Sequence, residues 1–123
     1  MGKKTVSLAL QGGGSHGAFT WGVLDRLLED DRIDIEAISG ASAGAINAVV
    51  LAHGLTAGGR EGARLALTEF WETVSSKVPF HFIPEDATIK TFLALTQYFS
   101  PYQLNPFNIN PLRSILESQL DFE

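Results

Sequence analysis

Ser42 lies at the centre of Gly40-Ala41-Ser42-Ala43-Gly44, which follows the G-x-S-x-G pattern of a nucleophile elbow. In such an elbow a serine hydroxyl stands on a sharp turn between a strand and a helix, where it projects towards a substrate. Gly40 and Gly44 provide the room that the turn needs, and the positive end of the following helix favours negative charge beside the serine. The alternative is a glycine-rich turn in which Ser42 only caps the helix. The apolar segment before the turn and the small residues after it favour the elbow, with Ser42 as the nucleophile.

A second glycine cluster precedes the elbow, and it has two interpretations. Gly12, Gly14 and Gly17 match the G-x-G-x-x-G pattern of a dinucleotide-binding turn. Such a turn also requires an acidic residue at the end of the next strand, about 20 positions later. Asp34 and Glu36 lie near that distance, but both fall in the first half of the expected strand. The elbow occupies the end of that strand, where the ribose would bind.

The other interpretation of the cluster is an oxyanion hole. In an acyl transfer the carbonyl oxygen becomes negative, and backbone N–H groups aimed at it stabilise the charge by about 3 kcal/mol each. Consecutive glycines let these N–H groups point into a site without an obstructing side chain. Turns after adjacent parallel strands emerge at the same edge of a sheet, so the two clusters are expected to face each other. This predicts an oxyanion hole formed by Gly12, Gly13 and Gly14 with the N–H of Ala43, and His16 as a neighbour of the site.

The elements that must position these turns follow from the periodicity of the apolar residues. Residues 6–10 form a short apolar run that predicts a buried strand, and residues 18–30 carry apolar side chains at helical spacing. Residues 33–39 alternate as a second strand, and residues 45–53 predict a helix of small residues. Strand, turn and helix in repetition indicate an α/β fold with a largely parallel sheet flanked by helices.

The residue pattern also predicts one face of the second strand and the end of the helix that follows it. The alternation in the second strand places Ile33, Ile35 and Ala37 together on its inward side. Gly54 is expected to end the helix of small residues, which puts His53 in the last helical turn.

The second half of the chain predicts helices over residues 61–75, 88–99 and 111–120, joined by segments rich in proline and aromatic residues. Two strands are too few to complete a core for this many helices. Residues 1–123 are therefore expected to be the N-terminal portion of a single domain, whose remainder lies outside this chain.

Two groups of apolar residues stand out in this second half. One face of the helix predicted over residues 61–75 carries Ala63, Leu67, Phe70, Trp71 and Val74. The aromatic cluster, expected to be core rather than an acyl-chain channel, is Phe80, Phe82, Phe92, Tyr98, Phe99, Tyr102 and Phe107.

Composition narrows the classes of function. The 123 residues carry a formal charge of −5 and scattered basic residues, which argues against a nucleic-acid partner. The chain has no cysteine, so thiolate catalysis, disulfides and cysteine-ligated zinc are excluded. Hydrophobic residues make up 45%, as in a globular protein, and the longest apolar stretch, residues 41–52, is too short to span a membrane. These features predict a cytoplasmic protein.

The two glycine-rich turns together resemble those of the patatin-like phospholipases. The resemblance is strong from Thr5 to Ala52 and weaker over residues 108–122. It implies a patatin-like three-layer α/β/α fold, incomplete in this chain, with the glycine run as the oxyanion hole and Ser42 as the nucleophile. It further implies a Ser–Asp dyad whose aspartate lies in a later D-G-[GA] motif, and hydrolysis of acyl esters of phospholipids, lysophospholipids or related lipids. No cofactor or metal is expected, and a membrane or micelle surface is a candidate partner.

The chain departs from the family pattern in two places. His16 stands where the family usually has arginine or lysine, and no Asp-Gly dipeptide occurs in the sequence. His53 is expected several helical turns from Ser42, and His81 is expected to be a partly buried structural histidine in a loop. Neither therefore has a better claim to be the base than an aspartate outside these residues. The aspartate is therefore expected outside this chain, in the remainder of the domain or on a second chain, and the chain alone is expected to be inactive. A dinucleotide-binding module and a non-catalytic lipid-binding pseudoenzyme stay as the alternatives.

Overall fold

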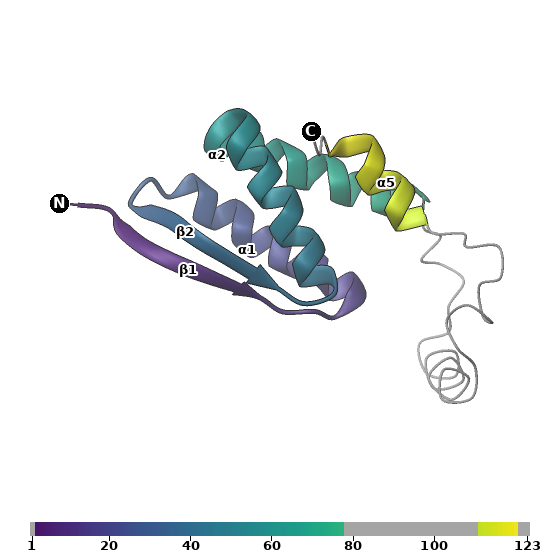
Figure 1. Ribbon diagram of the computed structural model, residues 1–123, viewed down its shortest axis with the longest axis horizontal. Helices are drawn as coiled ribbons and strands as arrows, with labels where there is room; N and C mark the ends of the chain where they lie inside the picture. Colours follow the sequence, from purple (N-terminus) through teal and green to yellow (C-terminus); the bar gives the residue numbers. More distant parts are fainter. Residues whose placement is uncertain (1, 78–110, 121–123) are drawn as a thin grey trace.

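The computed structural model describes residues 2–77 and 111–120. Two parallel strands form a sheet, and helices pack against it, so the predicted α/β architecture is confirmed (Figure 1). Because turns follow both strands at the same edge of the sheet, the chain brings its two glycine clusters together there. The elements in chain order are β1 (Lys4–Leu10), the 3-10 helix η1 (Gly14–His16), α1 (Gly17–Glu29), β2 (Ile33–Gly40), α2 (Ala43–Lys77) and α5 (Pro111–Gln119).

A bulge in β2 sets which side chains face the helices. The parallel register with β1 is interrupted after Ile35, so that Glu36 is an extra residue without an opposite partner. The pairing then resumes, and Leu8 lies opposite Ile38. As a result Ile38 packs on the core and Ala37 is exposed, so the prediction that Ala37 faces inward was wrong. Simple alternation fails here because one inserted residue moves every later side chain to the other face.

The core lies between the sheet and the helices. Leu24 and Leu28 of α1 are buried against Val50 and Leu51 of α2, and Ile115 of α5 is also fully buried. The helical face predicted for residues 61–75 is confirmed, because every one of its apolar members is buried. These members are Ala63, Leu67, Phe70, Trp71 and Val74.

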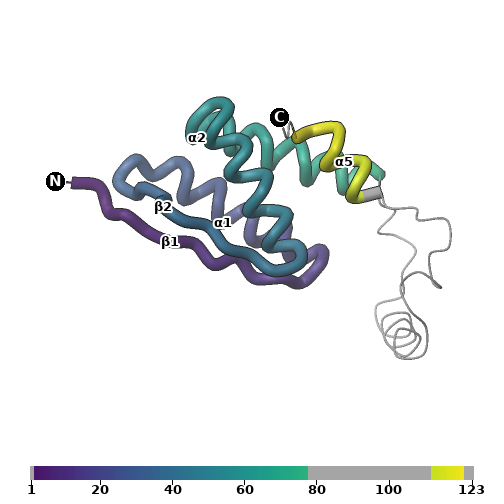
Figure 2. The backbone as a smooth tube through the Cα atoms, viewed as in Figure 1, coloured from purple at the N-terminus to yellow at the C-terminus, as the bar shows by residue number. Residues whose placement is uncertain are grey.

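The helix after β2 does not end at Gly54, so that prediction was wrong. Helical residues continue to Lys77, and the break falls at Gly58 and Gly59, of which Gly59 has a φ of 63°. Gly54 is buried where the two halves of α2 touch, and a Cβ there would lie 2.5 Å from the Cα of Ala63. The glycine thus serves a close helix–helix contact and not a helix end. Both views show α2 bending back towards α5 (Figures 1 and 2).

The helix predicted over residues 111–120 is confirmed as α5. Its Gln119 side chain donates to the carbonyl oxygen of Glu69 at 3.3 Å and to the hydroxyl of Thr73 at 3.1 Å, which ties α5 to the second half of α2. The helix expected over residues 88–99 lies outside the described residues. In the part of the chain that the structure describes, no helix combines the length and apolarity needed to cross a membrane.

Candidate active site

The turns after β1 and β2 are in direct contact at the carboxyl end of the sheet. The N–H of Ala41 donates to the carbonyl oxygen of Leu10 at 3.2 Å. A Cβ on Gly44 would collide with that same carbonyl, and a Cβ on Gly12 would lie 3.1 Å from the Cβ of Ser42. Glycine is therefore required on both sides of the contact, which confirms that the two clusters face each other.

Ser42 has the backbone conformation of a sharp elbow. Its φ is 53°, and no other non-glycine residue in residues 2–77 or 111–120 has a positive φ. Such a conformation costs a serine about 1–2 kcal/mol and is retained where the surrounding structure enforces it. Here the N–H of Gly44 donates to Ala41 and that of Ala45 donates to Ser42, both at 2.9 Å. A Cβ on Gly40 would collide with the carbonyl of Gly44, so the glycine before the serine is required as well.

The first glycine turn is held by its own histidine. Gly13 and Gly14 have φ values of 139° and 58°, a region in which side chains are rarely found. The backbone N–H and the ring Nδ1 of His16 both lie 3.1 Å from the carbonyl oxygen of Gly13. A carbonyl only accepts, so Nδ1 carries the proton in this contact. Because the peptide bond is trans, the N–H of Gly14 points in the opposite direction, away from His16.

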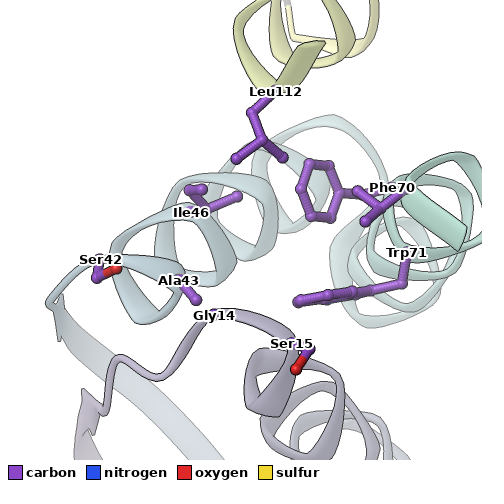
Figure 3. Close-up of a pocket in the computed structure, with 9 residues that line it drawn as sticks. Gly14, Ser15, Ser42, Ala43, Ile46, Phe70, Trp71 and Leu112 are labelled. Atoms are coloured by element: carbon purple, nitrogen blue, oxygen red, sulfur yellow. The ribbon is translucent and has the colours of Figure 1, made fainter. Parts of the chain in front are cut away.

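A pocket of about 230 Å³ opens beside Ser42 (Figure 3). Its walls are apolar, and no titratable side chain of the described residues lines it. Of the predicted oxyanion residues, Gly14 and Ala43 line the pocket, Gly12 lies against Ser42, and Gly13 is not in the lining. His16, predicted as a neighbour of the site, does not line the pocket either. The lining residues are Gly14, Ser15, Ser42, Ala43, Ile46, Phe70, Trp71, Val74 and Leu112.

The aromatic wall of this pocket was not found from the sequence. Phe70 and Trp71 meet edge to face, with ring centroids 5.4 Å apart, and Figure 3 shows both rings at the pocket. Helical spacing indicated that these side chains are buried, but spacing cannot tell a core neighbour from a pocket. The aromatic residues weighed for an acyl-chain channel all lie outside the described residues. They are Phe80, Phe82, Phe92, Tyr98, Phe99, Tyr102 and Phe107.

Comparison with known families gives one match over most of the chain. The family model described as patatin-like phospholipase matches residues 8–121. The chain belongs to the patatin-like phospholipase family. The match includes both glycine turns and α5, and membership supports a lipid acyl hydrolase at the level of the family. No curated protein and no solved structure matches the chain.

The acidic residues of the dinucleotide alternative are not placed for that role in this patatin-like chain. Asp34 lies near the start of β2, 3.4 Å from Lys3 and 3.5 Å from Arg60. Glu36 is exposed at the bulge and accepts a hydrogen bond from Ser7 at 3.2 Å. Neither carboxylate is at the carboxyl end of the strand, where a ribose would bind.

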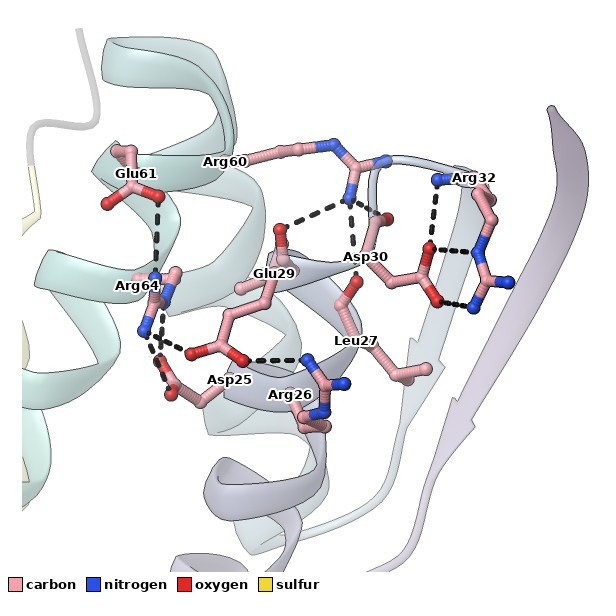
Figure 4. Close-up of polar contacts among 10 residues, drawn as sticks. Asp25, Arg26, Leu27, Glu29, Asp30, Arg32, Arg60, Glu61 and Arg64 are labelled. Carbon is pink, nitrogen blue, oxygen red and sulfur yellow. Dashed lines mark hydrogen bonds and ion pairs between the residues drawn. The ribbon is translucent and has the colours of Figure 1, made fainter.

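The opposite end of the patatin-like sheet is held by two arginines (Figure 4). The Arg60 guanidinium donates to the carbonyl oxygen of Asp30 at 2.9 Å and also reaches the carbonyls of residues 27, 28 and 33. These groups end α1 and begin β2, so Arg60 caps that turn. Arg64 bonds Asp25 and Glu29 of α1, each at 2.9 Å, and its hydrogen bond with Asp25 raises the pKa of the guanidinium.

His53 lies inside α2 and lines a separate hollow beside Gly54, and His81 is outside the described residues. Within residues 2–77 and 111–120, no group of three or more histidine, cysteine or carboxylate side chains is placed to hold a metal ion. Asn47 is fully buried in α2 and accepts a hydrogen bond from the pocket residue Trp71. It was not singled out from the sequence, although a lone amide within an apolar helical run is a visible signal.

Proposed function

We propose that this patatin-like protein hydrolyses acyl esters of lipids, with Ser42 as the nucleophile. The observation that carries the proposal is the positive φ of Ser42 at the mouth of an apolar pocket, directly against the glycine turn. Backbone strain that neighbouring glycines enforce is a feature of functional sites, and this strain presents a hydroxyl to a hydrophobic cavity. A serine that only capped a helix would not need it.

In the proposed reaction the Ser42 oxygen attacks the ester carbonyl and its proton passes to the base. The N–H of Ala43, the first residue of α2, has no intrahelical carbonyl to bond and is free for the developing oxyanion. The N–H of Gly14 points away from the fixed Gly13 carbonyl and is the second donor, with Gly12 and Gly13 as further members of the hole. The base then gives the proton to the departing alcohol. Water, activated by the same base, hydrolyses the acyl-enzyme and restores the serine.

The base in this proposal is an aspartate that is not among these 123 residues. The sequence holds no Asp-Gly dipeptide, and no acidic side chain in the described part of the chain lines the pocket. The remainder of the domain, on the same or a second chain, supplies the partner of the Ser–Asp dyad. We expect the 123-residue chain by itself to show no ester hydrolysis, and turnover by it would contradict this assignment.

The pocket favours the acyl part of the substrate. Its volume of about 230 Å³ is below the roughly 300–1,000 Å³ of sites that enclose a whole drug-sized ligand, so it fits one acyl chain. Ile46, Phe70 and Val74 supply apolar contact to such a chain. The head group would remain towards the opening, at a membrane or micelle surface. Phospholipids, lysophospholipids and neutral lipids all satisfy this arrangement, and a cytoplasmic location remains a prediction.

The direct test is hydrolysis of a series of p-nitrophenyl esters and phospholipid vesicles by the complete protein. We expect ester turnover that Ser42→Ala lowers by at least about a thousand-fold, as for other serine nucleophiles. Val74→Trp should narrow the pocket and shift preference towards shorter acyl chains, while Val23→Trp on the exposed side of α1 should leave the preference unchanged. Vesicle binding without turnover would support the pseudoenzyme, and nicotinamide-nucleotide binding without turnover would support the dinucleotide module.

A further inference from the structure

Asn47 is a polar side chain buried in the helix that begins at the elbow. It is 0% exposed and the one polar residue that is fully buried in residues 2–77 and 111–120. A buried amide is unfavourable unless both its ends are hydrogen-bonded. Its Nδ2 donates to the carbonyl oxygen of Gly17 at 3.0 Å, and its Oδ1 accepts from the indole Nε1 of Trp71 at 2.9 Å.

The two partners require an amide at this position. The Trp71 indole nitrogen can only donate, and the Gly17 carbonyl can only accept. These roles fix the orientation of the Asn47 amide, since the reverse orientation would set donor against donor. A carboxylate here would keep the acceptor but lose the donor to Gly17, and an aliphatic side chain would lose both.

The bonds of Asn47 join the two halves of α2, which both line the pocket, to the start of α1, which directly follows the pocket residues Gly14 and Ser15 of η1. Gly17 is the first residue of α1, immediately after the glycine turn, whereas Trp71 comes from the second half of α2. A Cβ on Gly17 would lie 2.8 Å from the Trp71 ring and 3.1 Å from the Cβ of Ala43, so the three residues are in close contact. Trp71 and Ala43 also line the pocket together with Ser42.

We infer that Asn47 is a positioning residue for acyl transfer, which fixes the glycine turn relative to Ser42 and the Trp71 ring in the pocket wall. This inference rests on the proposed hydrolase function. The N–H of Gly14 is attached to the turn that Asn47 anchors at Gly17, so a shift of the turn moves an oxyanion donor away from the reacting carbonyl. Displacements of about 1 Å reduce rates by up to about a hundred-fold in sites of this kind.

The test uses the complete protein, and its parent carries Trp21→Phe together with phenylalanine at any tryptophan outside these 123 residues, so that Trp71 becomes the only tryptophan. Trp21 does not line the pocket, and its indole nitrogen has no hydrogen-bond partner in the described part of the chain. Asn47→Asp and Asn47→Leu are made in this parent. Three quantities are measured: the rate at which a fluorophosphonate labels Ser42, kcat and KM for p-nitrophenyl butyrate, and acrylamide quenching of Trp71 fluorescence.

We expect the labelling rate and kcat of both variants to fall by at least about ten-fold while KM stays within about two-fold, since positioning acts on the transition state. Trp71 should become more accessible to acrylamide in Asn47→Leu, which loses the acceptor for its indole nitrogen, and less so in Asn47→Asp, which keeps that acceptor. The fraction of folded protein, followed by circular dichroism at the assay temperature, should remain that of the parent.

Labelling rates within about two-fold of the parent would overturn the inference and leave the proposed function intact. A loss of activity that only follows the unfolded fraction would overturn it too. If the fluorophosphonate labels neither the wild type nor the parent, and neither protein hydrolyses esters, the proposed function is overturned and this inference with it. Should Asn47→Leu not fold, Asn47→Asp carries the test by itself, because its carboxylate keeps the acceptor for Trp71 and loses the donor to Gly17, so that labelling should still fall by at least about ten-fold.

Discussion

The two ends of the β1–β2 sheet are held together by different means. At the carboxyl end, contacts between backbone atoms dominate, and Gly12, Gly44 and the strained Ser42 allow the two turns to touch. At the amino end, the guanidinium groups of Arg60 and Arg64 bind the end of α1 through charged hydrogen bonds. Backbone contacts therefore shape the end of the sheet at which the proposed oxyanion donors lie, whereas arginine side chains anchor the other end. Changes at the two ends should therefore have separable effects on activity and stability.

The largest effect on folding is expected for Gly44→Ala, at the carboxyl end. The new Cβ would collide with the carbonyl of Leu10, and displacement of the turn should lower the free energy of unfolding by about 3 kcal/mol. Ester hydrolysis should be lost as well, because the elbow moves. Gly22→Ala is the matched control, since its Cβ meets no atom within 4 Å and the change should stabilise α1 by about 1 kcal/mol. Urea unfolding measures the stability of the two variants. Equal stabilities would contradict the close contact between Gly44 and the carbonyl of Leu10.

Arg60→Met tests the amino end. Loss of the hydrogen bonds to the carbonyls at the end of α1 should lower the free energy of unfolding by about 2 kcal/mol. In the folded protein kcat/KM should stay unchanged, because Arg60 does not line the pocket. Arg26→Met, which removes an exposed pair with Glu29, is the control and should change stability little. A large fall in kcat/KM for Arg60→Met would show that the two ends are not separable.

Ser42→Gly should act in opposite directions on the two properties. Glycine adopts a φ of 53° without the cost that serine incurs, so the free energy of unfolding should rise by about 1 kcal/mol while hydrolysis is lost. Ser39→Gly, in the regular strand just before the elbow, should instead destabilise the protein by about 0.5–1 kcal/mol. Thermal melting of both variants compares them directly, and destabilisation by Ser42→Gly would mean that the elbow is not strained.

The smallest effect is expected for Arg32→Ala at the exposed turn before β2. Hydrogen bonds from Arg32 hold the pKa of Asp30 below its usual range. A carboxyl whose pKa is lowered on folding stabilises the protein above its unfolded pKa and loses that contribution as the pH falls through the folded pKa. The Tm of the wild type should therefore exceed that of Arg32→Ala slightly at neutral pH, and the difference should vanish in acid below the usual aspartate range. High salt should reduce it at neutral pH, and a difference that grows in acid would contradict the assigned cause.

The sequence was sufficient for the strands and for the meeting of the two glycine turns, because short apolar runs and glycine spacing report directly on local backbone geometry. It failed where one residue type serves two purposes. Gly54 suits a helix end as well as a close helix crossing, and only the contact with Ala63 distinguishes the two. Ala37 was misplaced because a bulge depends on pairing with another strand. Asn47 and Trp71, which are hydrogen-bonded beside the pocket, are 24 positions apart in the sequence, and periodicity cannot pair residues at that separation.

The central claim is that Ser42 is the nucleophile, and mass spectrometry of the complete protein after reaction with a fluorophosphonate tests it most directly. Ser15 is the matched comparison, because among the described residues it is the other hydroxyl that lines the pocket, and its backbone φ is not positive. The label should be found on the peptide that contains Ser42, should be absent from Ser42→Ala, and should persist on Ser42 in Ser15→Ala. A label on Ser15, or none on the wild-type protein, would contradict the account.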